Sequence, residues 1–99
     1  MSWYNPALGG VNCSVFSNGT CISKLANGES WQDWMNKNII ACPIELSFGT
    51  QIKIDKIVYI CKDRGGAITY DGQHYWVDVL TDSPTYSYGQ VVEAILINP

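Results

Sequence analysis

The sequence predicts an all-β domain, built as a small barrel or sandwich. Three observations support this: short segments alternate between apolar and polar residues, turn residues separate these segments, and helical patterns are almost absent. The chain has 99 residues, of which 46% are apolar and 15% charged, which suits one hydrophobic core. We therefore expect residues 1–99 to form a single domain.

The expected strands are short segments bounded by turn residues. Asn5-Pro6 ends the first strand, and Gly65-Gly66 break the run that follows the alternating segment "QIKIDKI". A tight connection after that segment would lead into "VYICK". We expect strands at residues 2–4 (SWY), 51–57 (QIKIDKI), 58–62 (VYICK), 75–80 (YWVDVL) and 91–97 (VVEAILI).

Two other segments interrupt this strand pattern. Residues 9–30 are rich in Gly, Asn and Ser, so we expect a loop-rich insertion there. One short helix is expected over residues 31–37, with Ser30 as its cap and Asp33 three residues later, as in a capping box. Pro43 ends whatever structure "NIIAC" adopts.

Charge and hydropathy exclude several classes of function. The net charge is -3 and the six Lys and Arg residues are scattered, so the chain lacks the basic stripe that nucleic acids or anionic membranes would require. No window approaches the roughly 18 apolar residues of a membrane span. No basic-then-apolar leader is present, so we expect any secretion signal to lie outside these residues.

Four cysteines suggest two disulfides. They show no CxxC spacing and His74 is the only histidine, which argues against a zinc site. Two disulfides would indicate an oxidising compartment, whereas buried free thiols in a cytosolic protein are the alternative. Of the three pairings available, we favour Cys13–Cys21, closing a polar loop, and Cys42–Cys61.

Asp78 stands out within "YWVDVL". Period-two alternation places Val77 and Val79 on one face of the strand, and Trp76, Asp78 and Leu80 on the other. Burial among bulky apolar groups would raise the pKa of Asp78, as a general acid requires near neutral pH. The alternative is an edge strand whose Asp78 faces water.

Four blocks in one order now point to a family. They are "SWYNPALGG", "ANGESW", "ACPIELSFGT" and "KDRGGAI…WVDVL", and the resemblance that they carry covers roughly residues 2–97. Their order resembles two patterns found in double-psi β-barrel domains of bacterial cell-wall proteins. One is the rare lipoprotein A family; the other is the three-aspartate domain shared with the membrane-bound lytic transglycosylase A family. The resemblance implies a six-stranded double-psi β-barrel with one short helix and long N-terminal loops.

The resemblance also implies two catalytic acids. Asp63 matches the Asp of the D-R-G and D-T-G-G-A-I motifs. Asp78 matches the Asp of I-D-L and I-D-x-F, which acts as the catalytic acid in the transglycosylase family and is needed for wall loosening in the similar expansins. We therefore expect Asp78 to be the acid and Asp63 to support it.

A further set of residues is expected to bind substrate. Ser2 and Tyr4 fall where expansin-like domains carry a Thr and an aromatic residue, and Glu29 matches the Glu of A-S-G-E. Small residues let backbone amides approach a sugar, and flat rings pack on pyranose faces. The remaining candidates are Gly65, Gly66, Tyr75 and Trp76.

Two departures from these family patterns affect the candidate site. Cys42 stands where the three-aspartate pattern has its first Asp, and Pro43 replaces a His of rare lipoprotein A, so one helper group of each relative is missing. A Cys42–Cys61 disulfide beside Asp63 would hold the geometry instead. Arg64 would lower the pKa of a nearby carboxyl, helping Asp63 to stay charged.

These expectations leave three functions open. The first is a lytic transglycosylase or glycoside hydrolase acting on peptidoglycan, the second a non-catalytic expansin-like polysaccharide-binding or wall-loosening module, and the third a phage structural domain that reuses the barrel. In each case we expect a monomer that is secreted, periplasmic, wall-associated or part of a phage particle. Neither the residues nor the resemblance implies a cofactor or a metal.

Overall fold

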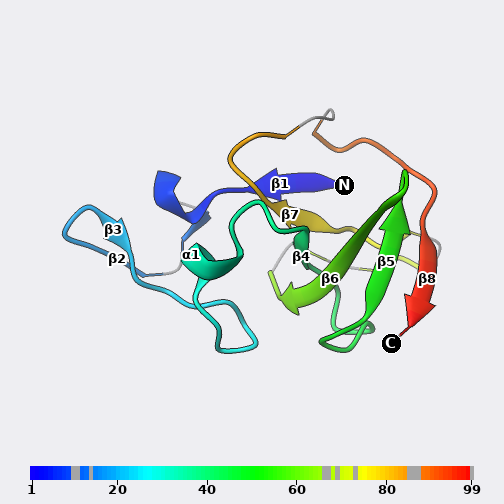
Figure 1. Cartoon of the computed structure of the whole chain (residues 1–99), viewed down its shortest axis with the longest axis horizontal. Coiled ribbons are helices and arrows are strands. Elements are labelled where there is room, and N and C mark those ends of the chain that lie inside the picture. Colours follow the sequence, from blue (N-terminus) through cyan, green and yellow to red (C-terminus); the bar gives the residue numbers. More distant parts are fainter. Residues whose placement is uncertain are drawn as a thin grey trace.

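The computed structural model describes residues 1–9, 12–13, 15–65, 68, 70–72, 74–84 and 88–98, and six of its strands form one mixed sheet (Figure 1). The strands lie in the order β1-β7-β4-β6-β5-β8, so β1 and β8 are the edges and the described sheet does not close into a barrel. The all-β class and one short helix are therefore confirmed, and double-psi closure stays a prediction. The strands are β1 (Ser2–Tyr4), β4 (Ile39–Ala41), β5 (Gln51–Ile54), β6 (Ile57–Asp63), β7 (Asp78–Leu80) and β8 (Ile95–Asn98).

The hairpin between β5 and β6 differs from the sequence prediction. The strand that begins at Gln51 was expected to run to Ile57, but β5 ends at Ile54 and the chain turns at Asp55 and Lys56. Both turn residues have positive φ, 49° and 70°, as a two-residue hairpin with the sheet's natural twist requires. The usual signal for this turn is Asn-Gly or Asp-Gly, and Asp-Lys does not carry it.

Residues 9–30 are not wholly irregular. They contain a small hairpin, β2 (Phe16–Ser17) and β3 (Thr20–Cys21), in a separate two-stranded sheet. A single-turn 3-10 helix, η1 (Pro6–Leu8), precedes this region. Cys13 is joined to Cys21 across 6.0 Å between Cα atoms, which ties the hairpin to the preceding chain.

The helix α1 (Trp31–Trp34) is shorter than expected and lacks the predicted capping box. Ser30 occupies the cap position, but its hydroxyl donates a hydrogen bond to Gln32 and makes no capping bond. The amide of Asp33 instead donates to the backbone carbonyl of Ser30. The backbone leaves helical geometry at Met35, where ψ is 129°.

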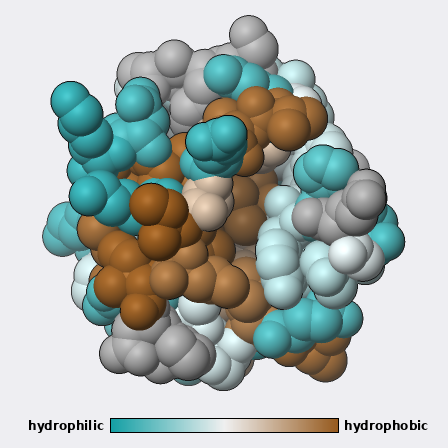
Figure 2. Space-filling model, turned by 90° about the vertical axis from the view of Figure 1, so that its right-hand side faces the viewer, coloured by the Kyte–Doolittle hydropathy of each residue, from teal (hydrophilic) through white to brown (hydrophobic). Residues whose placement is uncertain are grey.

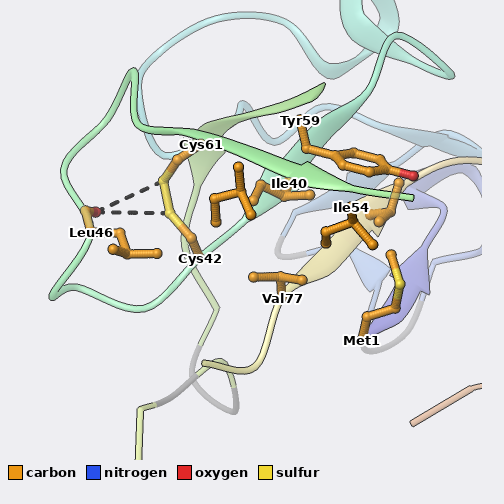
Figure 3. Packing of buried hydrophobic residues seen from close by; sticks show 10 residues of the cluster. Met1, Ile40, Cys42, Leu46, Ile54, Tyr59, Cys61 and Val77 are labelled. Atoms are coloured by element: carbon orange, nitrogen blue, oxygen red, sulfur yellow. Dashed lines mark hydrogen bonds between the residues drawn. A yellow bond between two sulfur atoms is a disulfide. The ribbon is translucent and has the colours of Figure 1, made fainter. Parts of the chain in front are cut away.

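Two clusters of buried residues pack on the sheet, and the alternation along residues 77–80 divides the apolar residues between them. Val77 and Val79 join the first cluster and Leu80 joins the second, as the sequence predicts. β7 lies between β1 and β4, so the edge-strand alternative for Asp78 is wrong. The first cluster (Figure 3) comprises Met1, Ile40, Cys42, Leu46, Ile52, Ile54, Tyr59, Cys61, Val77 and Val79. The second comprises Cys21, Leu25, Trp31, Ile39 and Leu80.

The second disulfide lies inside the first cluster. Cys42 and Cys61 are joined with their Cα atoms 5.9 Å apart, the pairing that the sequence analysis favours (Figure 3). Both residues are fully buried; Cys42 directly follows β4 and Cys61 lies within β6. Two disulfides fit a protein of an oxidising, extracellular-type compartment. None of the helices in the described ranges is long and apolar enough to cross a membrane.

Candidate functional site

The two candidate acids lie in one row across four neighbouring strands. Ser2 of β1 pairs with Asp78 of β7, Asp78 pairs with Ala41 of β4, and Ala41 pairs with Asp63 of β6. Residues paired directly across strands point to the same face of a sheet. Asp63 and Asp78 are two strand spacings apart, roughly 10 Å between their Cα atoms. Within the sheet, Ala41 is the residue between them.

A shift in strand register brings Asp63 into this row. Ile40 pairs with Cys61, yet the next residue, Ala41, pairs with Asp63, so β6 has one residue more than β4 at this step. In unbroken register Lys62 would stand opposite Ala41, and Asp63 would point to the other face. Irregularities of this kind commonly redirect a side chain next to a functional site.

Both carboxyls line one cavity of about 220 Å³. Tyr4 and Ala41 lie on its wall together with the acids, and Lys24 and Arg64 also line it. The remaining described residues that line it are Pro6, Asn12, Cys13, Ser23, Leu25, Trp31, Gly65 and Ile68. The predicted site residues Asp63, Asp78, Tyr4 and Gly65 therefore meet at one place, while Gly66 lies outside the described residues.

Asp63 is held by three hydrogen bonds. The Tyr4 hydroxyl donates to Oδ2 at 2.6 Å, and the backbone amides of Ala26 and Arg64 donate to Oδ1 at 2.8 and 2.9 Å. The pKa of Tyr4 is raised well above its usual range because the residue is buried and because the neighbouring Asp63 carboxylate repels a second negative charge and accepts the hydrogen bond of the hydroxyl. The phenol therefore stays a neutral donor, and Asp63 is fixed in orientation.

Asp78 is held more loosely. Its Oδ1 accepts one hydrogen bond, from the Ser2 hydroxyl at 2.8 Å. Burial raises the pKa of Asp78, and the charge of Asp63 raises it further, whereas the Ser2 hydrogen bond and the Met1 ammonium act in the opposite direction. A half-buried carboxyl with a raised pKa can donate and take back a proton, as general acid-base catalysis requires.

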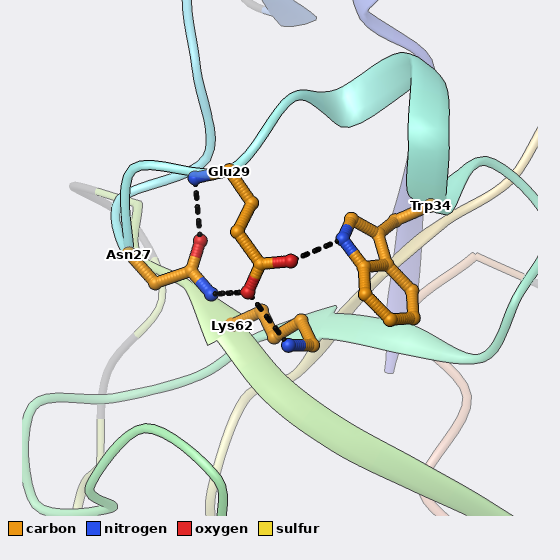
Figure 4. Close-up of polar contacts among 4 residues, drawn as sticks. All are labelled: Asn27, Glu29, Trp34 and Lys62. Carbon is orange, nitrogen blue, oxygen red and sulfur yellow. Dashed lines mark hydrogen bonds and ion pairs between the residues drawn. The ribbon is translucent and has the colours of Figure 1, made fainter.

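Glu29, which the sequence analysis expects to contact substrate, does not line this cavity and is bound to three other side chains. Its carboxylate accepts hydrogen bonds from Lys62 at 2.8 Å, Trp34 at 2.6 Å and Asn27 at 2.6 Å (Figure 4). The hydrogen bonds of Lys62 and then Trp34 lower the pKa of Glu29. These contacts fasten the loop that presents the Ala26 amide to Asp63. Glu29 thus supports the site from outside the cavity.

Tyr75 and Trp76 lie on a second, larger groove of about 550 Å³. Figure 2, which views the molecule from the β8 side, shows a hollow with hydrophobic residues along it. Tyr75 stacks on Tyr70, with ring centroids 4.2 Å apart, and each ring is more than a third exposed. The indole of Trp76 donates to the Ser2 hydroxyl at 2.9 Å, which connects this groove to the Asp78 row.

Arg64 turns away from both carboxyls. Its guanidinium donates to the Leu46 carbonyl at 2.7 Å, contacts the sulfur atoms of Cys42 and Cys61 at 2.8 and 3.0 Å, and lies 4.1 Å from the centre of the Phe48 ring. Arg64 therefore does not pair with a carboxyl as expected. It contacts the Cys42–Cys61 disulfide and the loop that contains Leu46.

Sequence reasoning missed the contribution of Ala41, whose small size leaves the space between the acids. The available signal was that Ala41 is the only residue of "IIA" that is not a bulky aliphatic. Among the described residues, no group of three or more His, Cys, Asp or Glu side chains could hold a metal ion. Comparison with known proteins found no match among family models, curated proteins or solved structures.

Proposed function

We propose that this chain is a peptidoglycan-active domain related to double-psi β-barrels, which cleaves the glycan in the manner of a lytic transglycosylase. One observation carries the proposal. Asp78, whose pKa is raised by burial, shares a cavity with Asp63, and only Ala41 separates them in the sheet. This function implies a protein that acts as a monomer and lies in the periplasm or at the cell wall.

The proposed reaction needs one carboxyl that changes its protonation state. Neutral Asp78 protonates the glycosidic oxygen, which stays on C4 of the next sugar as a hydroxyl when its bond to the muramoyl C1 breaks. The resulting Asp78 carboxylate then takes the proton from the muramoyl C6 hydroxyl, whose oxygen bonds to C1. The product is a 1,6-anhydro ring, water is not consumed, and Asp78 returns to its acid form.

Asp63 supports this reaction electrostatically. Its three donors fix it two strands from Asp78, where its charge favours the oxocarbenium-like state at C1. The cavity of about 220 Å³ is below the roughly 300–1,000 Å³ of ordinary small-molecule pockets, so it suits a single sugar ring. The rest of a glycan strand would lie outside it.

Digestion of purified sacculi tests the proposal. Mass spectrometry of the soluble products should find anhydro-muropeptides with the wild-type chain and not with Asp78→Asn. New reducing ends in place of anhydro products would indicate hydrolysis with both acids at work. Intact sacculi after prolonged incubation would refute cleavage.

The aromatic groove favours a second candidate, a non-catalytic polysaccharide-binding module. Tyr75 and Trp76 are 39% and 37% exposed and border the groove of about 550 Å³, where flat rings would pack on sugar faces. This function predicts that the chain sediments with insoluble glycan and leaves its covalent structure unchanged. Tyr75→Ala should abolish sedimentation, whereas Leu8→Ala, at a residue 75% exposed and not part of the groove, should not.

A further inference from the structure

The Ser2 hydroxyl stands between an indole and a carboxyl. Ser2 is 1% exposed, and its Oγ accepts a hydrogen bond from Trp76 Nε1 at 2.9 Å and donates one to Asp78 Oδ1 at 2.8 Å. An indole N–H can only donate, so it occupies a lone pair of the serine oxygen and favours the orientation in which the hydroxyl proton points at Asp78. Trp76 therefore sets the direction of the hydrogen bond from Ser2 to Asp78.

We propose that Trp76 is a positioning residue, which acts through Ser2 to keep the exchangeable proton of Asp78 on Oδ2. Since Oδ1 accepts the hydrogen bond of the Ser2 hydroxyl, Oδ2 is the oxygen left to carry the acid proton. No described residue donates a hydrogen bond to Oδ2, and Asp78 lines the cavity shared with Asp63. The inference rests on the acid role proposed above, and it assigns the reacting oxygen of that acid.

The charged groups around the Trp76–Ser2–Asp78 hydrogen bonds come from several elements. Asp63 faces Asp78 across Ala41, the Met1 ammonium precedes β1, and Lys24 and Arg64 line the same cavity. None of them lies between Trp76 and Asp78 in the hydrogen-bonded sequence. A response of the Trp76 indole to the ionisation of Asp78 would thus report the Ser2 link.

The wild-type protein offers the first test, in a pH titration by NMR without substrate. The Trp76 indole N–H resonance should shift with the same midpoint as the Asp78 carboxyl carbon, and this step should vanish in Asp78→Asn. Trp34, whose indole donates to Glu29, is the internal control, and its resonance should follow Glu29 at lower pH. A Trp76 resonance that does not move while Asp78 titrates would overturn the inference.

A double-mutant cycle gives the second test. Trp76→Phe keeps an aromatic ring but removes the N–H, which weakens the Ser2 bond and should move the Asp78 midpoint to higher pH. Ser2→Ala should move it further in the same direction, and adding Trp76→Phe to Ser2→Ala should then change nothing. Trp34→Phe, the matched control, should leave the midpoint in place.

Equal effects of Trp76→Phe with and without Ser2 would mean that the ring acts only by packing, and the proposal would fail. Since both titrations are made without glycan, this failure is separate from failure of the proposed reaction. Where wild-type protein does cleave sacculi, the alkaline limb of the pH–rate profile should move to higher pH in Trp76→Phe.

Discussion

Asp63 and Asp78 lie on the same face of one sheet, yet their surroundings differ sharply. Asp63 accepts three hydrogen bonds, two of them from backbone amides. Asp78 accepts one, from Ser2, and burial raises its pKa. The same side-chain type is thus held by three donors in one place, and by one donor with a raised pKa in the other.

The difference follows from what each strand end meets. β6 ends against the loop that Glu29 and Lys62 hold in place, so Asp63 finds donors from two segments of the chain. β7 begins at Asp78 between the central strand β4 and the short β1, where Ser2 is its only described donor. The two carboxyls therefore differ in solvation and in the number of hydrogen-bond donors, not in residue type.

The largest expected effect is on catalysis. Asp78→Asn removes the proton that the reaction needs, so release of anhydro-muropeptides should fall by about a hundredfold to ten-thousandfold. Release should be measured as initial rates on purified sacculi, with the fold of the variant checked by circular dichroism. A variant that retains the wild-type rate would remove the functional distinction between the two acids.

The two acids should affect stability in the reverse order, with Asp63→Asn costing more unfolding free energy than Asp78→Asn. Asp63→Asn replaces three charge-assisted hydrogen bonds with weaker ones and should lower the free energy of unfolding by about 1–3 kcal/mol. Asp78→Asn removes a poorly solvated charge and should be neutral or stabilising near neutral pH. Urea unfolding of both variants checks this, and equal losses would show that both acids are anchors.

A third expectation concerns the gap between the acids. Ala41→Val places two extra methyl groups on a residue that is 3% exposed and lies between Asp63 and Asp78. Overpacking should cost about 1–3 kcal/mol of unfolding free energy, and the cavity should no longer admit a ligand. Activity lost without loss of fold would support the site, whereas full activity would place substrate elsewhere.

Part of this comparison could be predicted from sequence. Alternation in "YWVDVL" correctly separated Val79 from Asp78, because a strand's side-chain period is fixed at two. The same rule could not predict the orientation of Asp63, since the register shift beside Ala41 is a property of two paired strands.

Side-chain partners were harder still to predict. Glu29 was assigned to the site by motif, and its carboxylate binds Trp34 and Lys62. Arg64 was assigned by charge, and its guanidinium binds the Leu46 carbonyl instead of a carboxyl. Pairing choices between flexible charged groups depend on tertiary distances that no local pattern encodes. The short turn at Asp55 and Lys56 was not predicted for a local reason, because neither residue is a glycine.

The smallest expected effect is on the pH dependence of stability. A carboxyl with a raised pKa and one with a lowered pKa should change the unfolding free energy in opposite directions as pH rises. The raised pKa of Asp78 means that the folded state holds its proton more tightly than the unfolded chain. This contribution is fully present below the unfolded-state pKa, about 3.9, and is lost as pH rises through the folded-state value. The unfolding free energy of wild type minus that of Asp78→Asn should therefore decline above about pH 4.

Glu29 supplies the matched control with the opposite sign. Its pKa is lowered in the folded state, so its contribution is present above the unfolded-state pKa and is lost as pH falls through the folded-state pKa. Wild type minus Glu29→Gln should therefore decline toward acid pH. Denaturant unfolding between pH 3 and 8 measures both differences on the same protein. Parallel slopes would mean that Asp78 is held as a carboxylate like Glu29, and the case for a proton carrier in this sheet would be lost.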